Sequence, residues 1–298
     1  MLPVVYHPEY VAPLPQGHRF PMQKFGLLYQ QLQDARIATP ASTRAPERIS
    51  DEELMLVHAP TYVRAFSDGT LPEQAMRRIG LPWSEELVLR TKRAVGGTLL
   101  TARLALRERL AVNTAGGTHH AHPEFGSGFC IFNDLAVTAR RLVAEGSVQR
   151  VLIFDLDVHQ GDGTAAAVQD DPAIFCVDIH CADNFPFRKQ TSHIDVALPA
   201  GTADAEYLGI VRETLERALT TIRPDLVLYD AGVDVFAGDR LGKLAISENG
   251  IARRDRLVLS RVRDAGIPVA AVIGGGYQKD LTRLAALHAT VHHEAAAL

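Results

Sequence analysis

Two acidic residues interrupt an otherwise apolar segment, which reads VLIFDLDVHQGDG from Val151 to Gly163. Asp155 and Asp157 are two residues apart, and in a strand this spacing puts both carboxylates on one face. A buried carboxylate is costly unless it is paired, hydrogen-bonded or bound to a metal, and His159 follows at once. The segment therefore predicts a metal site. The alternative, a set of structural ion pairs, is weaker because the segment itself holds no Lys or Arg.

A third acid, Asp234, completes the predicted ligand set. It follows the apolar segment LVLYDAG, and the glycine there lets the next side chain swing over the edge of a sheet. Two carboxylates and one imidazole leave open positions on a small divalent ion, as a catalytic zinc requires. The same donors suit iron(II), manganese or cobalt, so the metal's identity stays open. Asp230, in the same segment, is interpreted as a hydrogen-bonding partner of neighbouring loops.

Two adjacent histidines, His119 and His120, follow a glycine pair at the end of a short apolar segment. Such a pair can face a metal-bound water, with one ring as the base and the other as its electrostatic neighbour. Each ring needs an acid behind it to fix its tautomer, and Asp155 and Asp162 are available. A histidine pair is a weak signal by itself, and its place after a strand favours the functional interpretation. His122 is interpreted as a loop residue without a role.

A glycine-rich segment, GGGYQ from Gly274 to Gln278, follows the last predicted strand. Its glycines let the backbone pass close to a ligand, and Tyr277 could then donate its hydroxyl to developing negative charge. The alternative is an ordinary turn. The segment lacks the G-x-G-x-x-G spacing of dinucleotide-binding proteins, and GDGT at Gly161 lacks the Lys of a phosphate-binding loop.

The elements that must position these residues alternate between strand and helix. Predicted strands cover 110–115, 151–159, 173–180, 225–232 and 268–277. Predicted helices cover 50–57, 84–110, 134–145, a short stretch after Gly163, 204–223, 247–266 and the end of the chain from 279, and the segment 38–48 is predicted as a surface connection. Apolar strands that alternate with helices predict an α/β fold: one domain over 1–298, with a mostly parallel sheet between two helical layers. Ligands bind at the carboxyl ends of such strands, where the unusual residues stand.

The composition excludes several classes of partner. Hydrophobic residues make up 47% of the 298, and the net charge is -4, which disfavours nucleic acid or an anionic membrane as a partner. No apolar run reaches the length of about 18 residues that a membrane span needs. We expect no signal peptide, because no basic region precedes an apolar one at the start. Three cysteines without a CxxC pair predict free thiols and a cytoplasmic protein.

Five segments, in order, resemble the zinc-dependent histone deacetylase family: GGTHHA, GSGFCIFND, DLDVHQGDG, AGVDVFAGDRLGKLAIS and GGGYQK. The resemblance runs from VVYHPEY near the start to the last predicted helix, so it covers essentially the whole chain. Each motif alone is weak evidence for the family, but five motifs in the same order are specific for it. Gln160, where the larger classes often have a second His, resembles the class IV branch, as do GDRLGKLAIS and GGYQK.

The resemblance implies an arginase/deacetylase-like fold and a set of residue roles. The zinc ligands would be Asp157, His159 and Asp234. The catalytic residues would be His120 as base and then acid with Asp162 behind it, His119 as its electrostatic partner with Asp155 behind it, and Tyr277 polarising the acyl carbonyl. The channel for the lysine stem would be lined by Gly128, Phe129 and Phe185. A structural potassium or sodium ion would be bound by Asp155, Asp157, His159 and Asp178, the last standing where the family often has a serine.

The expected reaction is hydrolysis of the amide of an acyl-lysine in a protein or peptide, with an acetyl or a longer fatty acyl group. Three alternatives stay open. A deacylase of small acylated amines, such as acetylpolyamines, would share every catalytic residue. A two-manganese ureohydrolase on the same fold would need D-x-H-x-D spacing, and Asp162 falls one residue late for it. A non-catalytic acyl-lysine-binding module would have lost a ligand or the tyrosine, and both are present.

Overall fold

A twisted sheet of eight parallel strands forms the centre of the molecule in the computed structural model, which describes residues 1–298. The strand order is β2-β1-β3-β8-β7-β4-β5-β6, and every neighbouring pair is parallel. The strands are β1 (Val4–Val5), β2 (Thr43–Arg44), β3 (Leu110–Asn113), β4 (Val151–Asp155), β5 (Ile174–Cys181), β6 (Ile194–Leu198), β7 (Leu226–Asp230) and β8 (Val269–Val272). The predicted α/β fold is confirmed, and the sheet is wholly parallel.

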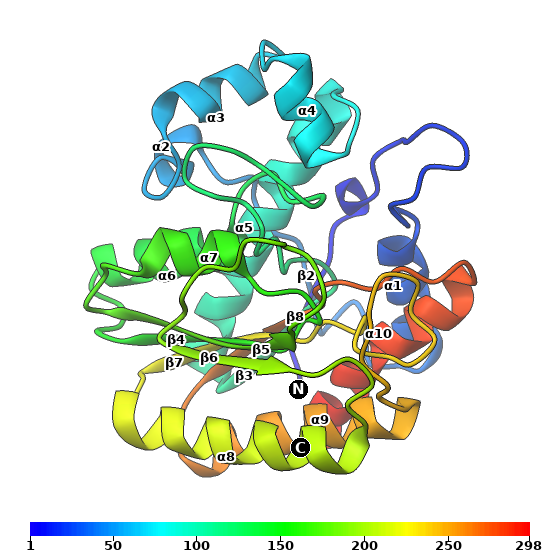
Figure 1. The fold of residues 1–298 in the computed structure, drawn as a ribbon, viewed down its shortest axis with the longest axis vertical. Coiled ribbons are helices and arrows are strands. Elements are labelled where there is room, and N and C mark those ends of the chain that lie inside the picture. The colour runs from blue at the N-terminus through cyan, green and yellow to red at the C-terminus, as the bar shows by residue number, and fades with distance from the viewer.

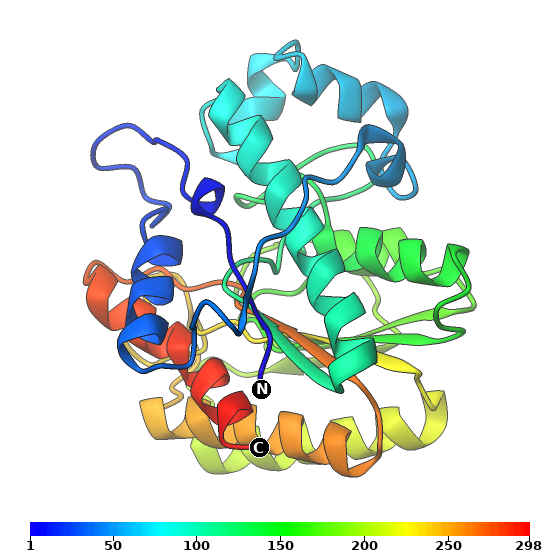
Figure 2. The ribbon, with the colours of Figure 1, turned by 180° about the vertical axis from the view of Figure 1, so that it is seen from behind.

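Helices cover both faces of this sheet (Figure 1). One layer contains α5 (Glu85–Glu108), α6 (Asp134–Ala144) and α7 (Asp162–Val168), and the other contains α8 (Asp204–Ile222), α9 (Glu248–Asp264) and α10 (Leu281–Ala296). Seen from behind, α1 (Lys24–Asp34) lies against α10, and the long α5 rises to a group of short helices (Figure 2). That group comprises α2 (Asp51–Leu54), α3 (Pro60–Ser67) and α4 (Glu73–Ile79). No helix combines the length and apolar character needed to cross a bilayer.

Several helix ends follow the capping chemistry expected from the sequence. Ser50 and Glu53 form a capping box, in which the Glu53 backbone N–H donates to Ser50 Oγ at 3.2 Å, but the helix ends at Leu54, before Val57. Ser84 caps α5 through the Leu87 N–H at 3.1 Å. The short helix expected after Gly163 begins before that glycine, at Asp162. The segment 38–48, expected as a connection only, contributes the edge strand β2.

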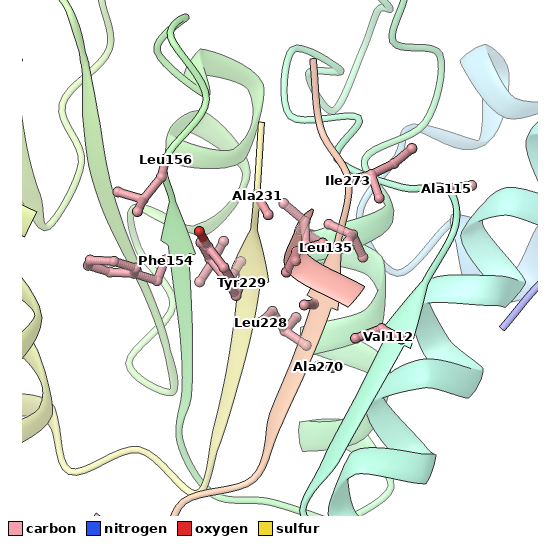
Figure 3. Packing of buried hydrophobic residues seen from close by; sticks show 14 of the residues in the cluster. Val112, Ala115, Leu135, Phe154, Leu156, Leu228, Tyr229, Ala231, Ala270 and Ile273 are labelled. Atoms are coloured by element: carbon pink, nitrogen blue, oxygen red, sulfur yellow. The ribbon is translucent and has the colours of Figure 1, made fainter. Parts of the chain in front are cut away.

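The interior between sheet and helices is one continuous apolar core of 82 buried residues. Figure 3 shows its centre, where Leu228, Ala270 and Val112 of three adjacent strands lie beside Leu135 of α6. Complete burial of such a side chain is worth about 1.5–3 kcal/mol for Val or Leu. The strands are therefore held firmly, and the loops at their carboxyl ends start from fixed positions.

Candidate metal centre and active site

Three side chains converge beyond the carboxyl ends of β4 and β7. Asp157 and His159 follow β4, and Asp234 follows β7, so pairing of these two strands brings the segments together. One potential ligand atom of each lies within 4.8 Å of the others. His159 Nδ1 lies 3.0 Å from Asp157 Oδ1 and 3.2 Å from Asp234 Oδ2. The residues predicted as metal ligands thus meet at one point.

Backbone groups hold the two carboxylates in place. The Gly275 N–H donates to Asp157 Oδ2 at 2.7 Å, and the Val158 N–H donates to Asp234 Oδ1 at 2.9 Å. A Cβ on Gly275 would lie 2.0 Å from Asp234 Oδ2, so only glycine lets this backbone reach the carboxylates. Each carboxylate keeps one oxygen directed toward His159.

The electrostatics of this cluster fit a divalent cation. Burial disfavours the charged imidazole of His159, but hydrogen bonds and the charges of Asp157 and Asp234 outweigh it and raise its pKa to about 10. Burial and the nearby Asp157 charge raise the pKa of Asp234 to about 7. Two buried carboxylate oxygens facing one ring nitrogen repel each other unless a cation lies between them. This donor set of two oxygens and one nitrogen suits zinc and also iron(II), manganese or cobalt.

The adjacent histidines each contact a separate acid. His119 Nδ1 lies 2.7 Å from Asp155 Oδ2, and His120 Nδ1 lies 2.6 Å from Asp162 Oδ1. Burial and the charge of His119 lower the pKa of His120 to about 4, against the effect of Asp162. Burial opposes the charge of His119, but Asp155 and Asp157 raise its pKa well above the ordinary value. The two rings thus differ in environment: Asp155 and Asp157 favour the charged form of His119, whereas burial and the charge of His119 disfavour the charged form of His120.

His122 is part of this arrangement, so its interpretation as a bystander was wrong. Its Nε2 lies 2.9 Å from Asp162 Oδ2, and its ring stacks on Phe125 with centroids 4.4 Å apart. Asp162 therefore bridges two histidines. Burial raises its pKa, but the hydrogen bonds from His120 and His122 lower it well below the ordinary range. The HHAH spacing was the sequence signal for the contact between His122 and Asp162, because the chain turns back on itself directly after His120.

The hydrogen bonds expected for Asp230 to neighbouring loops are absent, so that prediction was wrong as well. Both of its carboxylate oxygens are buried and have no partner. They point toward the backbone of Gly117 and Gly274, where an added Cβ would lie 2.8 and 2.2 Å from them. Burial and the charge of Asp155 raise the pKa of Asp230 well above its ordinary value, which favours the neutral acid.

Asp178, expected at a monovalent-cation site, is one of three buried acids in a row across the sheet, and Asp195 of β6 pairs with it on its other side. In the sheet register Asp155 of β4 pairs with Asp178 of β5 on one side and with Asp230 of β7 on the other. Asp178 accepts from the Gly161 N–H at 2.7 Å and contacts His180 Nδ1 at 2.7 Å. Burial and the charge of Asp155 raise its pKa to about 7. The structure brings Asp155 and Asp178 together and puts Asp157 and His159 just beyond them.

A pocket of about 580 Å³ leads from the surface to this centre, and its lining includes His120, His159 and Tyr277. Phe129 and Phe185, predicted as channel walls, also line it: the Phe185 ring lies 4.9 Å from that of His120, and the Phe129 ring 5.9 Å from that of Tyr277. Gly128 joins the lining with a left-handed φ of 54°, followed by Phe129 at 68°.

Four further residues support the site and were not identified from the sequence. Asp239 accepts the Tyr277 backbone N–H at 2.7 Å, and Asn184 Nδ2 approaches His159 Nε2 at 3.5 Å. Lys24 and Arg90, both buried, line a small inner cavity of about 30 Å³ behind Tyr277. Lys24 Nζ donates to the Gly274 carbonyl at 3.1 Å. These residues lie far apart in the sequence, and no motif links them to the predicted metal ligands.

The comparisons with known proteins agree on one protein family. A family model described as the histone deacetylase domain matches residues 18–293. An uncharacterized protein from Picosynechococcus sp. is 55% identical over 293 residues, which is 98% of each chain. Histone deacetylase 2 of Arabidopsis thaliana is 32% identical over 278 residues, covering 90% of this chain and 72% of the plant protein.

Two further similarities extend the comparison. The acetoin utilization protein AcuC of Staphylococcus aureus is 32% identical over 249 residues, covering 76% of this chain and 64% of AcuC. The crystal structure of the HDA15 HD domain superposes with a TM-score of 0.80 at 21% identity, covering 98% of this chain and 86% of that one. At this identity the superposition shows that the fold is shared.

Proposed function

The chain belongs to the histone deacetylase family, and from that premise we propose that it is a zinc-dependent hydrolase of the amide bond of N6-acyl-lysine. The convergence of Asp157, His159 and Asp234 at the base of an open pocket, beside His120 and Tyr277, carries the proposal. The products are a free amine and a carboxylic acid. Gln160 in the DLDVHQGDG motif supports a class IV-like member.

The reaction needs a cation, a base and an oxyanion donor, and the residues for each are present. When bound by Asp157, His159 and Asp234, zinc supplies Lewis-acid polarisation of the amide carbonyl and acidifies a water. His120, whose Nδ1 is engaged by Asp162, would take the proton of the attacking water at Nε2 and later deliver it to the leaving amine. The Tyr277 hydroxyl donates to the tetrahedral oxyanion. His119, held by Asp155, lies against the His120 ring as its electrostatic partner.

The inner cavity supports a short acyl group. Its volume of about 30 Å³ suits a small group, and Lys24 and Arg90 stand among the aromatic and glycine residues that line it, whereas an extended alkyl chain would need a larger apolar space. We therefore infer that acetyl is preferred to a long fatty acyl chain. Asp155 and Asp178 support a structural potassium or sodium ion beneath the site. Three free, buried cysteines support a cytoplasmic location.

The test combines metal analysis with a panel of acyl-lysine peptides. We expect one catalytic divalent metal per chain, release of acetate from an acetyl-lysine peptide, and slower turnover of the myristoyl-lysine counterpart. Asp234→Asn should lose both the metal and the activity. Two divalent metals per chain with no turnover of any acyl-lysine peptide would refute the proposal, whereas faster turnover of the myristoyl peptide would refute only the preference for acetyl.

A further inference from the structure

The mouth of the 580 Å³ pocket is strongly cationic. Its lining contains five basic residues and one acidic residue, Asp183; the basic ones are Arg19, Arg77, Arg78, Arg240 and Lys243. All six are exposed. The chain as a whole carries a net charge of -4, so the charge of the mouth is opposite in sign to that of the protein.

Most of this positive charge is not neutralised within the protein. Only Arg77 forms an ion pair, with Glu73 at 2.6 Å, and both partners are largely exposed, so the pair is weak. The Arg78 guanidinium lies over the Phe125 ring, 4.5 Å from its centroid, and Lys243 Nζ donates to the neutral Asp183 carbonyl. The half-buried Asp239, next to Arg240 in sequence, has its carboxylate engaged by backbone N–H groups of the adjoining turn and of Tyr277.

A purely structural origin explains only part of this cluster. Arg77 and Arg78 stand in the last turn of α4, where basic residues suit the helix dipole. Arg240 and Lys243 belong to the loop after Asp234, and Arg19 precedes α1, so no helix end accounts for them. Three separate segments therefore bring positive charge to the same rim, directly around the channel formed by Phe129 and Phe185.

We propose that the substrate is a polypeptide in which acidic side chains flank the acyl-lysine. This inference rests on the proposed deacylase function and specifies its substrate. An acyl-lysine stem is neutral, so the stem fills the channel while the neighbouring residues meet the rim. Exposed charges act over about 8–10 Å at ordinary salt, which covers the residues on either side of the lysine. Acetylpolyamines carry further ammonium groups, and the rim repels them.

A polypeptide fits the rim better than a small anionic amine does. Phe187 and Leu241 both line the mouth, and they are 95% and 41% exposed. These apolar groups extend the contact area beyond the reach of a single acylated amino acid. A substrate chain that crosses the mouth would cover Phe187 while its acidic side chains reach Arg240 and Arg78.

The test compares three peptides with the same acetyl-lysine, flanked by aspartates, by serines or by lysines. We expect kcat/KM to be about tenfold higher for the acidic than for the basic peptide at low salt, with the ratio falling toward one at high salt. Arg240→Glu and Arg78→Glu should each lower this ratio. Arg217→Glu, an exposed charge on α8 away from the pocket, is the matched control and should leave it unchanged. Equal or reversed ratios in the wild-type enzyme would overturn the proposal.

Two further arms separate the alternatives. Phe187→Ser should lower kcat/KM for the acidic peptide severalfold and leave that for free Nε-acetyl-lysine unaltered; equal effects on both would favour a small anionic substrate and overturn the polypeptide assignment. Faster turnover of acetylspermidine than of every peptide would also overturn it. If no acyl-lysine compound is hydrolysed at all, the deacylase function itself fails, which is a different result from turnover without charge preference.

Discussion

Asp162 is the residue whose substitution best tests the arrangement around His120. Its two carboxylate oxygens lie 2.6 Å from His120 Nδ1 and 2.9 Å from His122 Nε2. Both contacts require an acceptor. In Asp162→Asn one of the two oxygens becomes an NH₂ group, which donates and cannot accept. Either His120 keeps its acceptor and loses the negative charge behind it, or it takes the other tautomer and its Nε2 carries the proton.

The two outcomes set the size of the expected effect. Replacing a charge-assisted hydrogen bond by a neutral one costs about 2 kcal/mol, which is about 30-fold in rate if the cost falls on the transition state. The wrong tautomer removes the base, and in serine proteases the equivalent change of Asp to Asn lowers kcat by about 10⁴. We therefore expect kcat of Asp162→Asn to fall between about 30-fold and 10⁴-fold, with the metal retained.

The assay is kcat with an acetyl-lysine peptide at saturating concentration, together with metal content per chain. His122→Gln is the matched control, because it removes the second partner of Asp162 and leaves the contact with His120 in place. We expect it to lower kcat by less than about tenfold. A kcat for Asp162→Asn within threefold of the wild type, at equal metal content, would refute the reasoning that Asp162 sets the tautomer of His120.

Three further predictions follow from single features. Tyr277→Phe should lower kcat by about 10²–10³ without changing Tm, because only the Tyr277 backbone makes a hydrogen bond within the protein; an equal fall in Tm would contradict this. Chelation of the metal should lower Tm in calorimetry, because Asp157 and Asp234 then repel each other, and added zinc should restore it; Asp157→Asn should respond little to chelator. Burial lowers the pKa of His58 from 6.5 to about 4, so on acidification the unfolded chain binds a proton at a higher pH than the folded protein does. The free energy of unfolding should therefore fall as the pH drops from about 6.5 to 4, by up to about 3 kcal/mol. Urea unfolding of His58→Gln across this range should show a shallower slope, and an unchanged slope would reject the assignment.

The segments that carry the predicted metal ligands could be identified from the sequence because their chemistry is local. Asp155 and Asp157 break an apolar strand within three residues, and the glycines beside His119 and Tyr277 mark close backbone approach. Parallel strands end at one edge of the sheet, so residues that follow separate strands come together without further information. The fold class followed from the same alternation of apolar strands and helices.

Other elements carried too little local signal. The edge strands β1 and β2 have two residues each, which is below the length at which periodicity can be detected. In β6 the alternating residues are only half-buried, because this strand lies at the other edge. The short helices α3 and α4 are stabilised by what they contact. The Tyr62 hydroxyl of α3, for example, donates to the Ile131 carbonyl at 2.7 Å, 69 residues away in sequence.

The row of Asp178, Asp155 and Asp230 explains why residue type alone did not determine role. All three are buried aspartates at the same register level of adjacent strands. Asp155 contacts His119, Asp178 accepts a backbone N–H, and Asp230 has no hydrogen-bond partner, because different loops pass over each strand end. The hydrogen bonding of each acid depends on segments from other parts of the chain. His119 follows β3 and Gly161 precedes α7, whereas two glycines lie beside Asp230 and neither donates a hydrogen bond to it. The strand pattern predicts the position of each acid in the sheet. The loop that covers the strand end determines whether that acid is protonated, accepts a hydrogen bond or binds a cation.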